Sequence, residues 1–321
     1  MSKLVLVAVG GNALMRAGER GLAELQFEHA LETASTVIKI IKAGHRVVLT
    51  HGNGPQIGAA LVRSEMSAAH AYRMPYDCCL AATQGEIGYV LQYALWQMMQ
   101  KERLHIPIAA LITQVRVEKS DPAFTHPTKP IGPYLTKEEA QRYEQELGWA
   151  MVQQRQGYRR VVPSPEPKEI IELEAIRACV DRGLLVIAGG GGGIPVFNDH
   201  DISKGVEAVI DKDLTSAILA SQLKADVFAI ATGEEYVYLN YGKPSQHAVS
   251  RLTYDECAKY LGEGQFPEGS MEPKIRAAMA YLLRGGKEAI ITDARHLVPA
   301  IHGEAGTRIT MTEQEALFDW P

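Results

Sequence analysis

Continuous apolar runs along the chain alternate with segments in which apolar residues recur every three to four positions. The first pattern predicts strands buried on both faces, and the second predicts amphipathic helices. Strands that alternate with helices predict an α/β sandwich with a largely parallel sheet. The expected strands are residues 3–9, 46–50, 108–117, 184–188, 227–232 and 288–292, and the expected helices are residues 21–43, 56–71, 80–99, 173–181, 213–222 and 271–284.

One stretch interrupts this alternation. From about residue 118 to 167 the chain is rich in prolines and charged residues and has no long apolar run. A disordered loop is one interpretation. The aromatic residues Tyr134, Tyr143, Trp149 and Tyr158 argue against it, because disordered segments contain few aromatics. We therefore expect a small subdomain, about residues 118–163, that lies as a lid on the main sheet.

Three of the expected strands end in glycine-rich turns. Gly10-Gly11-Asn12 follows the first strand, Gly52-Asn53-Gly54 the second, and the five glycines 189–193 the fourth. Ligands of open α/β sheets bind at the carboxyl ends of the strands, and glycine lets backbone N–H groups approach an anion. One such turn is better explained as a structural turn. Three of them favour an anion site.

The second turn has a further feature. Pro55 follows it and suits the first turn of a helix, so we expect Gly52-Asn53-Gly54 to lead into a helix N-terminus that attracts anions. The dinucleotide pattern GxGxxG with an acidic residue about 20 positions later is absent, and so is the P-loop pattern GxxxxGK[ST]. These absences weaken a dinucleotide-binding interpretation and exclude a P-loop protein.

Three lysines have settings that suit phosphoryl transfer, which needs cations at fixed positions. Lys129 lies among prolines that stiffen the chain, Lys212 lies between two aspartates, and Lys274 follows Ser270, an expected helix N-cap. Each lysine alone is more simply interpreted as a solvated surface charge. The aspartates that flank Lys212 are more simply explained as an N-cap, Asp211, and a first-turn acid, Asp213, and the three residues as a plain ion-pair cluster.

The histidines and cysteines add little chemistry. His51, at the end of the second strand, is more simply structural than catalytic, and His126 and His200 lack the spacing of metal ligands, so no structural metal is expected. The four cysteines, Cys78, Cys79, Cys179 and Cys257, form no CxxC pattern.

Composition narrows the functional class further. The chain has 321 residues, 46% of them hydrophobic, and a formal net charge of −5, so no global basic excess suggests a nucleic-acid or anionic-membrane partner. The apolar run at residues 4–9 is too short to cross a bilayer, which takes about 20 residues. Together with the cysteine pattern, these features predict a reduced, cytoplasmic protein.

Taken together, the glycine turns and the lysine segments resemble the carbamate kinases of the amino-acid kinase superfamily. The resemblance runs in order through almost the whole chain. The matching segments are residues 9–13, 51–56, 83–88, 111–115, 127–133, 160–165, 190–195, 207–213, 240–244, 269–274 and 306–307.

The resemblance implies an open three-layer αβα sandwich with a mainly parallel central sheet and a protruding subdomain at about 118–163. Residues 1–205 would bind carbamate or carbamoyl phosphate, and residues 206–321 the nucleotide. The implied reaction is ATP + carbamate ⇌ ADP + carbamoyl phosphate, used catabolically to make ATP. Mg²⁺ would arrive on ATP or ADP with no metal held by the protein, and a homodimer is implied.

The resemblance also implies roles for single residues. Lys129, Lys212, Lys274 and Asp213 would be catalytic. The substrate would lie against Gly10, Gly11, Asn12, Gly52, Asn53, Gly54, Gly191 and Gly192, and the nucleotide against Lys212, Asp213, Thr232, Tyr238 and Lys274.

Three segments depart from the family pattern. Gly189 replaces a cysteine or another small residue, and the resulting run of five glycines is expected to loosen its loop. Residues 232–236 lack the usual acidic–aromatic pattern, which affects the expected nucleotide contacts, and residues 197–204 also differ. Two alternatives stay open: another small-anion kinase of the same fold that forms an acyl phosphate, or a catalytically silent binding or regulatory homologue.

Overall fold

The computed structural model describes residues 2–10, 23–199 and 202–311. Its centre is an eight-stranded sheet in the order β15-β17-β16-β12-β1-β2-β9-β3. All neighbouring strands run parallel except β16 and β17. The strands are β1 (Leu4–Val9), β2 (Arg46–His51), β3 (Ile108–Ala110), β9 (Leu185–Ile187), β12 (Val227–Thr232), β15 (Arg251–Thr253), β16 (Ala289–Asp293) and β17 (Thr307–Thr310).

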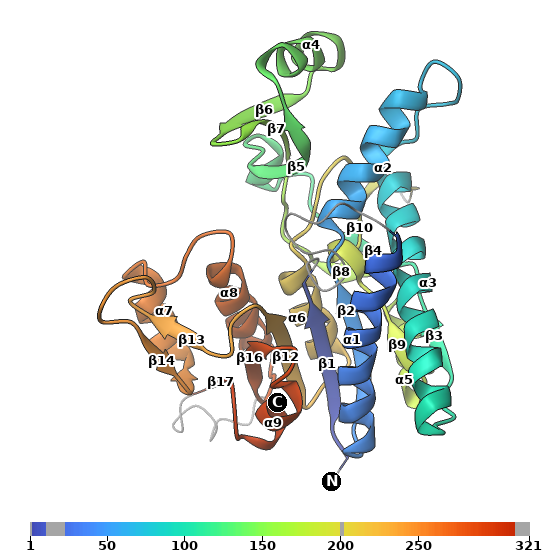
Figure 1. Ribbon diagram of the computed structural model, residues 1–321. Helices are drawn as coiled ribbons and strands as arrows, with labels where there is room; N and C mark the ends of the chain where they lie inside the picture. Colours follow the sequence, from blue (N-terminus) through green and yellow to red (C-terminus); the bar gives the residue numbers. More distant parts are fainter. Residues whose placement is uncertain (1, 11–22, 200–201, 312–321) are drawn as a thin grey trace.

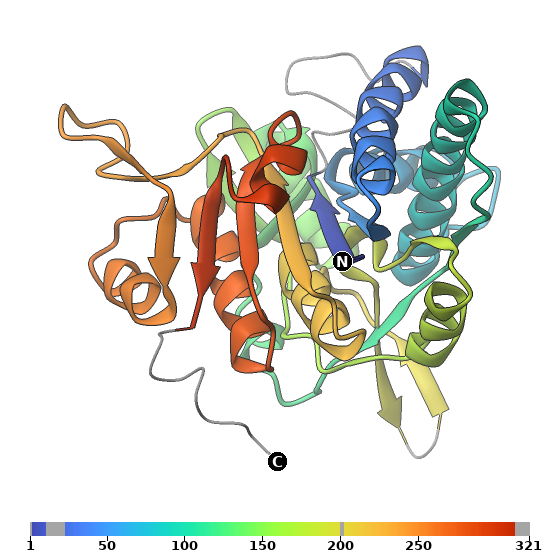
Figure 2. The same cartoon turned by 90° about the horizontal axis from the view of Figure 1, so that it is seen from below.

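Strand β1 shows why this sheet is covered on both faces. All of its residues are buried, and successive side chains point to opposite faces. Leu4 and Leu6 pack into one apolar cluster, whereas Val5 and Val7 pack into the other. The predicted mainly parallel α/β sandwich is confirmed, and Figures 1 and 2 show its three layers.

Helices from distant parts of the chain form the two outer layers. On the face of Val5, α1 (Ala23–Lys42) and α3 (Tyr76–Glu102) lie side by side, with α9 (Leu297–His302) next to α1. The face of Leu4 is covered by α5 (Leu173–Asp181), α6 (Lys212–Gln222), α7 (Tyr254–Gly262) and α8 (Met271–Leu283). No helix in the described ranges is long and apolar enough to cross a membrane.

One predicted strand is wrong in its extent. Residues 108–117 form two strands in different sheets, because the chain leaves the main sheet after β3 and enters a four-stranded sheet at β4 (Gln114–Arg116). At the break, the side chain of Gln84 bonds both backbone groups of Thr113, and the Thr113 carbonyl also accepts from the Ile194 amide at 2.9 Å. The other strands of the second sheet are β8 (Glu169–Ile170), β10 (Ile194–Asp199) and β11 (Ile202–Gly205).

The expected subdomain is an ordered unit. It contains β5 (Lys129–Leu135), α4 (Lys137–Leu147), β6 (Ala150–Gln154) and β7 (Gly157–Val162), with the antiparallel sheet order β5-β7-β6. Two of the aromatic residues build its interior: the rings of Tyr143 and Trp149 lie 4.9 Å apart, and the guanidinium of Arg160 lies 4.1 Å from the centre of the Trp149 ring. A short 3-10 helix, η2 (Pro122–Phe124), precedes the unit.

The subdomain stands above the carboxyl ends of β1 and β2 (Figure 1). Its base packs on α2 (Gly54–Ser67), where Ile131 and Val162 share an apolar cluster with Ile57 and Leu80. The base is thus part of the protein core.

The C-terminal third has more strands than the pattern predicts. Two short ones, β13 (Val237–Leu239) and β14 (His247–Val249), form a separate antiparallel pair. The main sheet draws four strands from residues 1–205 and four from residues 206–321, joined where β1 pairs with β12. The division into two binding parts at residue 205 stays a prediction.

Candidate active site

The strands that precede the first two glycine-rich turns end at the same carboxyl edge of the main sheet, because β1 and β2 are parallel neighbours. Gly10 lies at the end of β1, while Gly11 and Asn12 fall outside the described residues. The Gly52 amide donates to the Val9 carbonyl, 3.1 Å away, so it extends the sheet and is not free for an anion.

The second turn leads into a helix, as predicted. Helix α2 begins at Gly54, with Pro55 in its first turn. The side chain of Asn53 does not cap this helix; its Nδ2 donates instead to Thr83 Oγ1 on α3, at 2.9 Å. The Gly54 amide donates to no acceptor within the described ranges, so the positive end of α2 is left open to a ligand.

The third glycine turn is tightly held, which corrects the expectation of a loose loop. It includes the short 3-10 helix η3 (Gly190–Gly192). Gly191 and Gly192 have φ values of 65° and 89°, which favour glycine. A Cβ on Gly191 would collide with the Asn53 side chain, and one on Gly192 with the Ile210 carbonyl. Each of these glycines fits because its neighbours occupy the space that a side chain would need.

Two amides of this turn, those of Gly190 and Gly191, have no acceptor among the described residues. The Gly192 amide donates to the Gly189 carbonyl at 3.1 Å, and the Gly189 amide donates to Thr113 Oγ1 at 2.9 Å. Because Gly191 packs against Asn53, its open amide lies beside the second turn.

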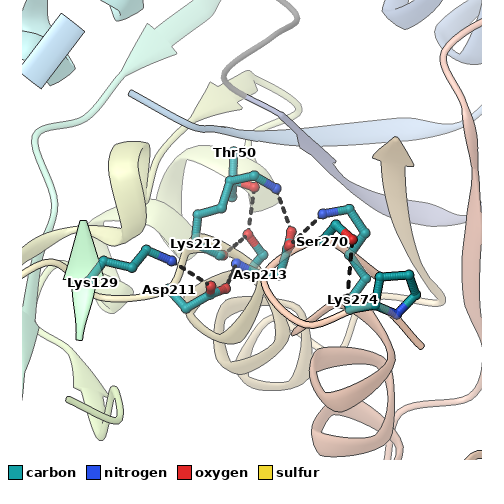
Figure 3. Close-up of polar contacts among 9 residues, drawn as sticks. Thr50, Lys129, Asp211, Lys212, Asp213, Ser270 and Lys274 are labelled. Carbon is teal, nitrogen blue, oxygen red and sulfur yellow. Dashed lines mark hydrogen bonds and ion pairs between the residues drawn. The ribbon is translucent and has the colours of Figure 1, made fainter. Parts of the chain in front are cut away.

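Two of the three lysines meet on one carboxylate. Asp213 is 3% exposed, and its Oδ1 accepts a hydrogen bond from Lys212 while its Oδ2 lies 3.2 Å from Lys274 Nζ. Burial acts to raise the pKa of Asp213, but the two ammonium groups outweigh it and hold the pKa below its ordinary value. Asp213 is therefore a carboxylate, and it holds two cations in fixed positions (Figure 3).

The third lysine reaches the same cluster from the subdomain. Lys129 Nζ, on β5, lies 3.3 Å from Asp211 Oδ2. The other oxygen of Asp211 accepts from the Asp213 amide at 2.9 Å, so Asp211 also caps α6. Figure 3 shows the three lysines arriving from three different elements around these two aspartates. Three ammonium groups against two carboxylates leave a net charge of +1, which suits an anionic ligand.

Two hydroxyl groups fix the start of α6. Ser216 Oγ donates to the Lys212 carbonyl at 2.6 Å and lies 2.7 Å from Thr50 Oγ1, which makes Thr50 the donor of the second bond. Thr50 thereby links the end of β2 to the helix that carries Lys212. The expected capping by Ser270 is wrong: Ser270 makes no side-chain bond to α8 and instead donates to the Pro267 carbonyl, 3.3 Å away.

The remaining predicted residues are more widely spread. Thr232 lies at the carboxyl end of β12, opposite Asp293 of β16. Tyr238 lies on the separate β13–β14 pair, where its ring is 6.1 Å from that of Tyr241. Both belong to residues 206–321, but no contact ties Thr232 or Tyr238 to the lysine cluster in the described structure.

His51 is buried under the third glycine turn. Its Nδ1 lies 3.1 Å from the Gly52 carbonyl, and its ring fills the space next to Gly190. Burial lowers the pKa of His51 to about 4, so the ring is neutral at physiological pH.

Comparison with known proteins places this geometry in a family. A sequence model described as the amino acid kinase family matches residues 3–293. The chain belongs to the amino acid kinase family. A carbamate kinase of Thermococcus kodakarensis is 42% identical over 96% of this chain and 99% of its own length. An Escherichia coli protein named carbamate kinase-like protein YahI is 44% identical over 97% of this chain and all of its own.

Solved structures of this family agree with these relatives. The carbamate kinase of Giardia lamblia bound to AMP-PNP superposes with a TM-score of 0.92 at 38% identity, covering 97% of this chain and 99% of that one. The resemblance to carbamate kinases drawn from the sequence is confirmed.

Sequence reasoning missed several polar residues of this amino acid kinase site. Asp211, interpreted from the sequence as a helix cap or as an ion-pair partner of Lys212, caps α6 and forms its ion pair with Lys129. Thr113, Thr215 and Gln84 all bond the third glycine turn or its neighbours. The sequence did hold a signal for Gln84, because it is a polar residue at a position of α3 whose neighbours on the same face, such as Leu80 and Ile87, are apolar.

Proposed function

We propose that this protein is a carbamate kinase that transfers a phosphoryl group reversibly between carbamoyl phosphate and ADP, giving ATP and carbamate. One observation carries the proposal: three lysines from separate elements converge on the Asp211–Asp213 pair. A transferred phosphoryl group spreads negative charge over three oxygens, and enzymes stabilise it with fixed cations and N–H donors. The cluster supplies such cations at a stable geometry.

Each charged residue has a distinct role in this proposal. Lys212 and Lys274 neutralise the phosphoryl oxygens, and Asp213 keeps both ammonium groups in place before substrate binds. Lys129 approaches from the subdomain and is held by Asp211. Lys212, Lys274 and Asp213 also line the nucleotide phosphates, with Thr232 and Tyr238 as further nucleotide contacts.

The glycine turns complete the substrate site. The open amides of Gly54 and Gly191 are proposed to bind carbamoyl phosphate, and Gly10, Gly52, Asn53 and Gly192 shape the pocket through backbone and side-chain packing. Gly11 and Asn12 belong to the same proposed site. Carbamate is an anionic nucleophile, so the reaction needs no strong general base.

We propose that Mg²⁺ enters on the nucleotide phosphates. Within the described ranges, no group of three or more histidine, cysteine or acidic residues is placed to hold a metal ion. When the nucleotide is bound, the ion would neutralise part of the negative charge on its phosphate groups.

A second candidate is another small-anion kinase of the same fold. The Escherichia coli relative is named only carbamate kinase-like, although it is 44% identical. The same lysine cluster would serve any acceptor that forms an acyl phosphate. A catalytically silent homologue is less well supported, because Lys129, Lys212 and Lys274 are all present and brought together.

We further propose a homodimer, with catabolic ATP synthesis in the cytoplasm. Tyr89, Tyr93 and Trp96 are exposed on α3, and Phe27 of α1 stacks edge-on against the two tyrosines. These four residues, here called the α3 aromatic patch, lie on the helix layer next to the open edge strand β3 and suit a second copy of the chain. All four cysteines are free, in keeping with a reducing compartment.

The direct test supplies the purified protein with carbamoyl phosphate and MgADP and follows ATP by luciferase luminescence. A carbamate kinase makes ATP in proportion to enzyme, and the Lys274→Ala variant serves as the matched blank. If no ATP appears above that blank, while ATP is consumed with another small carboxylate acceptor, the second candidate is correct instead.

A further inference from the structure

Gln84 places a polar side chain in the protein interior, where its amide must form hydrogen bonds. It lies on α3 and is 4% exposed, on the inward side of the helix with Leu80, Ile87 and Leu91. A buried amide without partners costs roughly 1–3 kcal/mol, so such a residue persists only where its hydrogen bonds are made.

The side-chain amide of Gln84 makes three bonds to two other segments. Its Nε2 donates to the Thr113 carbonyl at 3.1 Å and to the Gly190 carbonyl at 2.9 Å, and its Oε1 accepts from the Thr113 amide at 2.8 Å. The side-chain amide thus bonds Thr113 between β3 and β4, where the Thr113 carbonyl also accepts from the Ile194 amide. The remaining N–H fixes the third glycine turn.

Thr113, which Gln84 bonds, also bonds the third glycine turn. Its hydroxyl accepts from the Gly189 amide at 2.9 Å and donates to the Leu111 carbonyl at 2.9 Å. On the other side, Thr215 Oγ1 donates to the Gly192 carbonyl at 2.8 Å. The turn is therefore bonded at Gly189, Gly190 and Gly192, immediately around the open amide of Gly191.

Packing alone does not hold the turn on the α3 side. A cavity of about 160 Å³ lies there, lined among others by His51, Gln84, Ala188 and Gly190. Side chains that do not fill a space cannot keep a glycine turn from shifting into it. On this side, the hydrogen bonds of Gln84 and of Thr113 to the turn then oppose such a shift, and the Gly190 carbonyl that Gln84 bonds also accepts from the Gly193 amide at 3.0 Å.

We infer that Gln84 is a positioning residue for carbamoyl phosphate: it holds the Gly190 carbonyl so that the neighbouring Gly191 amide stays in place for the substrate. This inference rests on the proposed function. Gln84 bonds Thr113, which precedes β4, and the third glycine turn, and it makes no hydrogen bond to α8 or β12, which carry proposed nucleotide contacts. Its loss should therefore weaken the use of carbamoyl phosphate more than the use of ADP.

The test compares Gln84→Met with Gln92→Met in the full chain. Gln92 lies two turns further along α3 and makes one long bond, 3.5 Å, to the Ile108 carbonyl, so it controls for loss of any glutamine from this helix. We expect kcat/KM for carbamoyl phosphate to fall about 100-fold in Gln84→Met, the effect of a displacement of about 1 Å. The KM for MgADP should stay within about twofold, and Gln92→Met should match the wild type.

Equal changes for both substrates, or kinetics equal to those of the wild type, would overturn the inference. If Gln84→Met does not fold, Gln84→Glu keeps the acceptor for Thr113 and places a carboxyl oxygen against two carbonyls. Its defect relative to the wild type should grow as pH rises from 6 to 8 and the introduced group loses its proton. A constant ratio would contradict the role.

A second measurement separates this inference from the proposed function. Hydrogen exchange of the peptide that spans residues 188–194 should be at least tenfold faster in the Gln84 variant than in Gln92→Met, whatever reaction the wild type catalyses. Unchanged exchange overturns the positioning role. A wild-type protein that makes no ATP, but whose exchange responds as described, overturns only the carbamate kinase proposal.

Discussion

The Oδ2 atom of Asp213 lies 3.2 Å from the Nζ atom of Lys274, although the two residues are 61 positions apart and belong to the first turns of different helices. Lys212 bonds the other oxygen of the same buried carboxylate. A carboxylate that pairs with two ammonium groups leaves excess positive charge beside it, and both helix N-termini add to that charge. The start of α6 and the start of α8 therefore form one electropositive point.

The first prediction concerns Lys274. Lys274→Ala removes one of the cations proposed to bind the transferred group, and it should lower kcat about 100- to 1,000-fold, as the loss of one fixed charge-stabilising donor does. Lys287→Ala is the control, because Lys287 pairs with Asp226 on the surface. Steady-state kinetics of both variants make the comparison. Unchanged turnover in Lys274→Ala would remove this lysine from the site.

The second prediction concerns the third glycine turn. In Gly192→Ala the alanine backbone must keep φ near 89°, and its Cβ collides with the Ile210 carbonyl. The free energy of unfolding should therefore drop by at least about 1 kcal/mol. Gly262→Ala is the control, because Gly262 ends α7 with open space around it. Urea unfolding measures both. Equal stability in the two variants would show that the turn is more adaptable than its packing indicates.

The fold was largely predictable where sequence pattern and burial agree. The helix at 173–181 and the strand at 227–232 have the predicted bounds, because each is a compact apolar segment with clear ends. The predicted strand at 108–117 is wrong at Thr113, since the side chain of Gln84, 29 positions earlier in the chain, bonds its amide and shares its carbonyl with the Ile194 amide. A periodicity argument contains no information on such a side-chain partner.

The sequence could predict which residues belong to the candidate site better than it could predict the contacts between them. The segments around Lys129, Lys212 and Lys274 were recognisable, but the pairing of Lys129 with Asp211 joins residues 82 positions apart. The sequence also could not predict which glycine amides lack an acceptor, because the amides of Gly52 and Gly192 donate to backbone carbonyls. Such bonds depend on the relative placement of whole strands.

The third prediction concerns pH and stability. His51 has a folded-state pKa of about 4, against about 6.5 in an unfolded chain. Between these values the unfolded chain binds a proton that the folded protein does not, so stability falls as pH drops from about 6.5 to about 4. From pH 7 to pH 5 this group alone should cost about 2 kcal/mol.

The His51→Gln variant tests this contribution. It lacks the titrating ring, so its free energy of unfolding should fall less between pH 7 and pH 5 than that of the wild type, by about 2 kcal/mol. Chemical denaturation at the two pH values gives the difference. Parallel curves for the two proteins would show that His51 is not held neutral by burial.

The fourth prediction concerns assembly. Trp96→Glu places a charge in the α3 aromatic patch and should convert a dimer into monomers at micromolar concentration. Tyr72→Glu is the control, because Tyr72 is also highly exposed but lies between α2 and α3, away from the patch. Sedimentation velocity distinguishes the two species. A wild-type monomer, or a Trp96→Glu dimer, would remove the patch as the interface.

The convergence of three lysines on one transferred group is tested most directly by a crystal structure with MgADP, carbamate and aluminium fluoride, a planar mimic of the phosphoryl group in transfer. The account predicts the mimic within hydrogen-bond distance of the Nζ atoms of Lys129, Lys212 and Lys274, with the Gly54 and Gly191 amides beside it. A mimic bound elsewhere, or one contacted by none of these lysines, would contradict it.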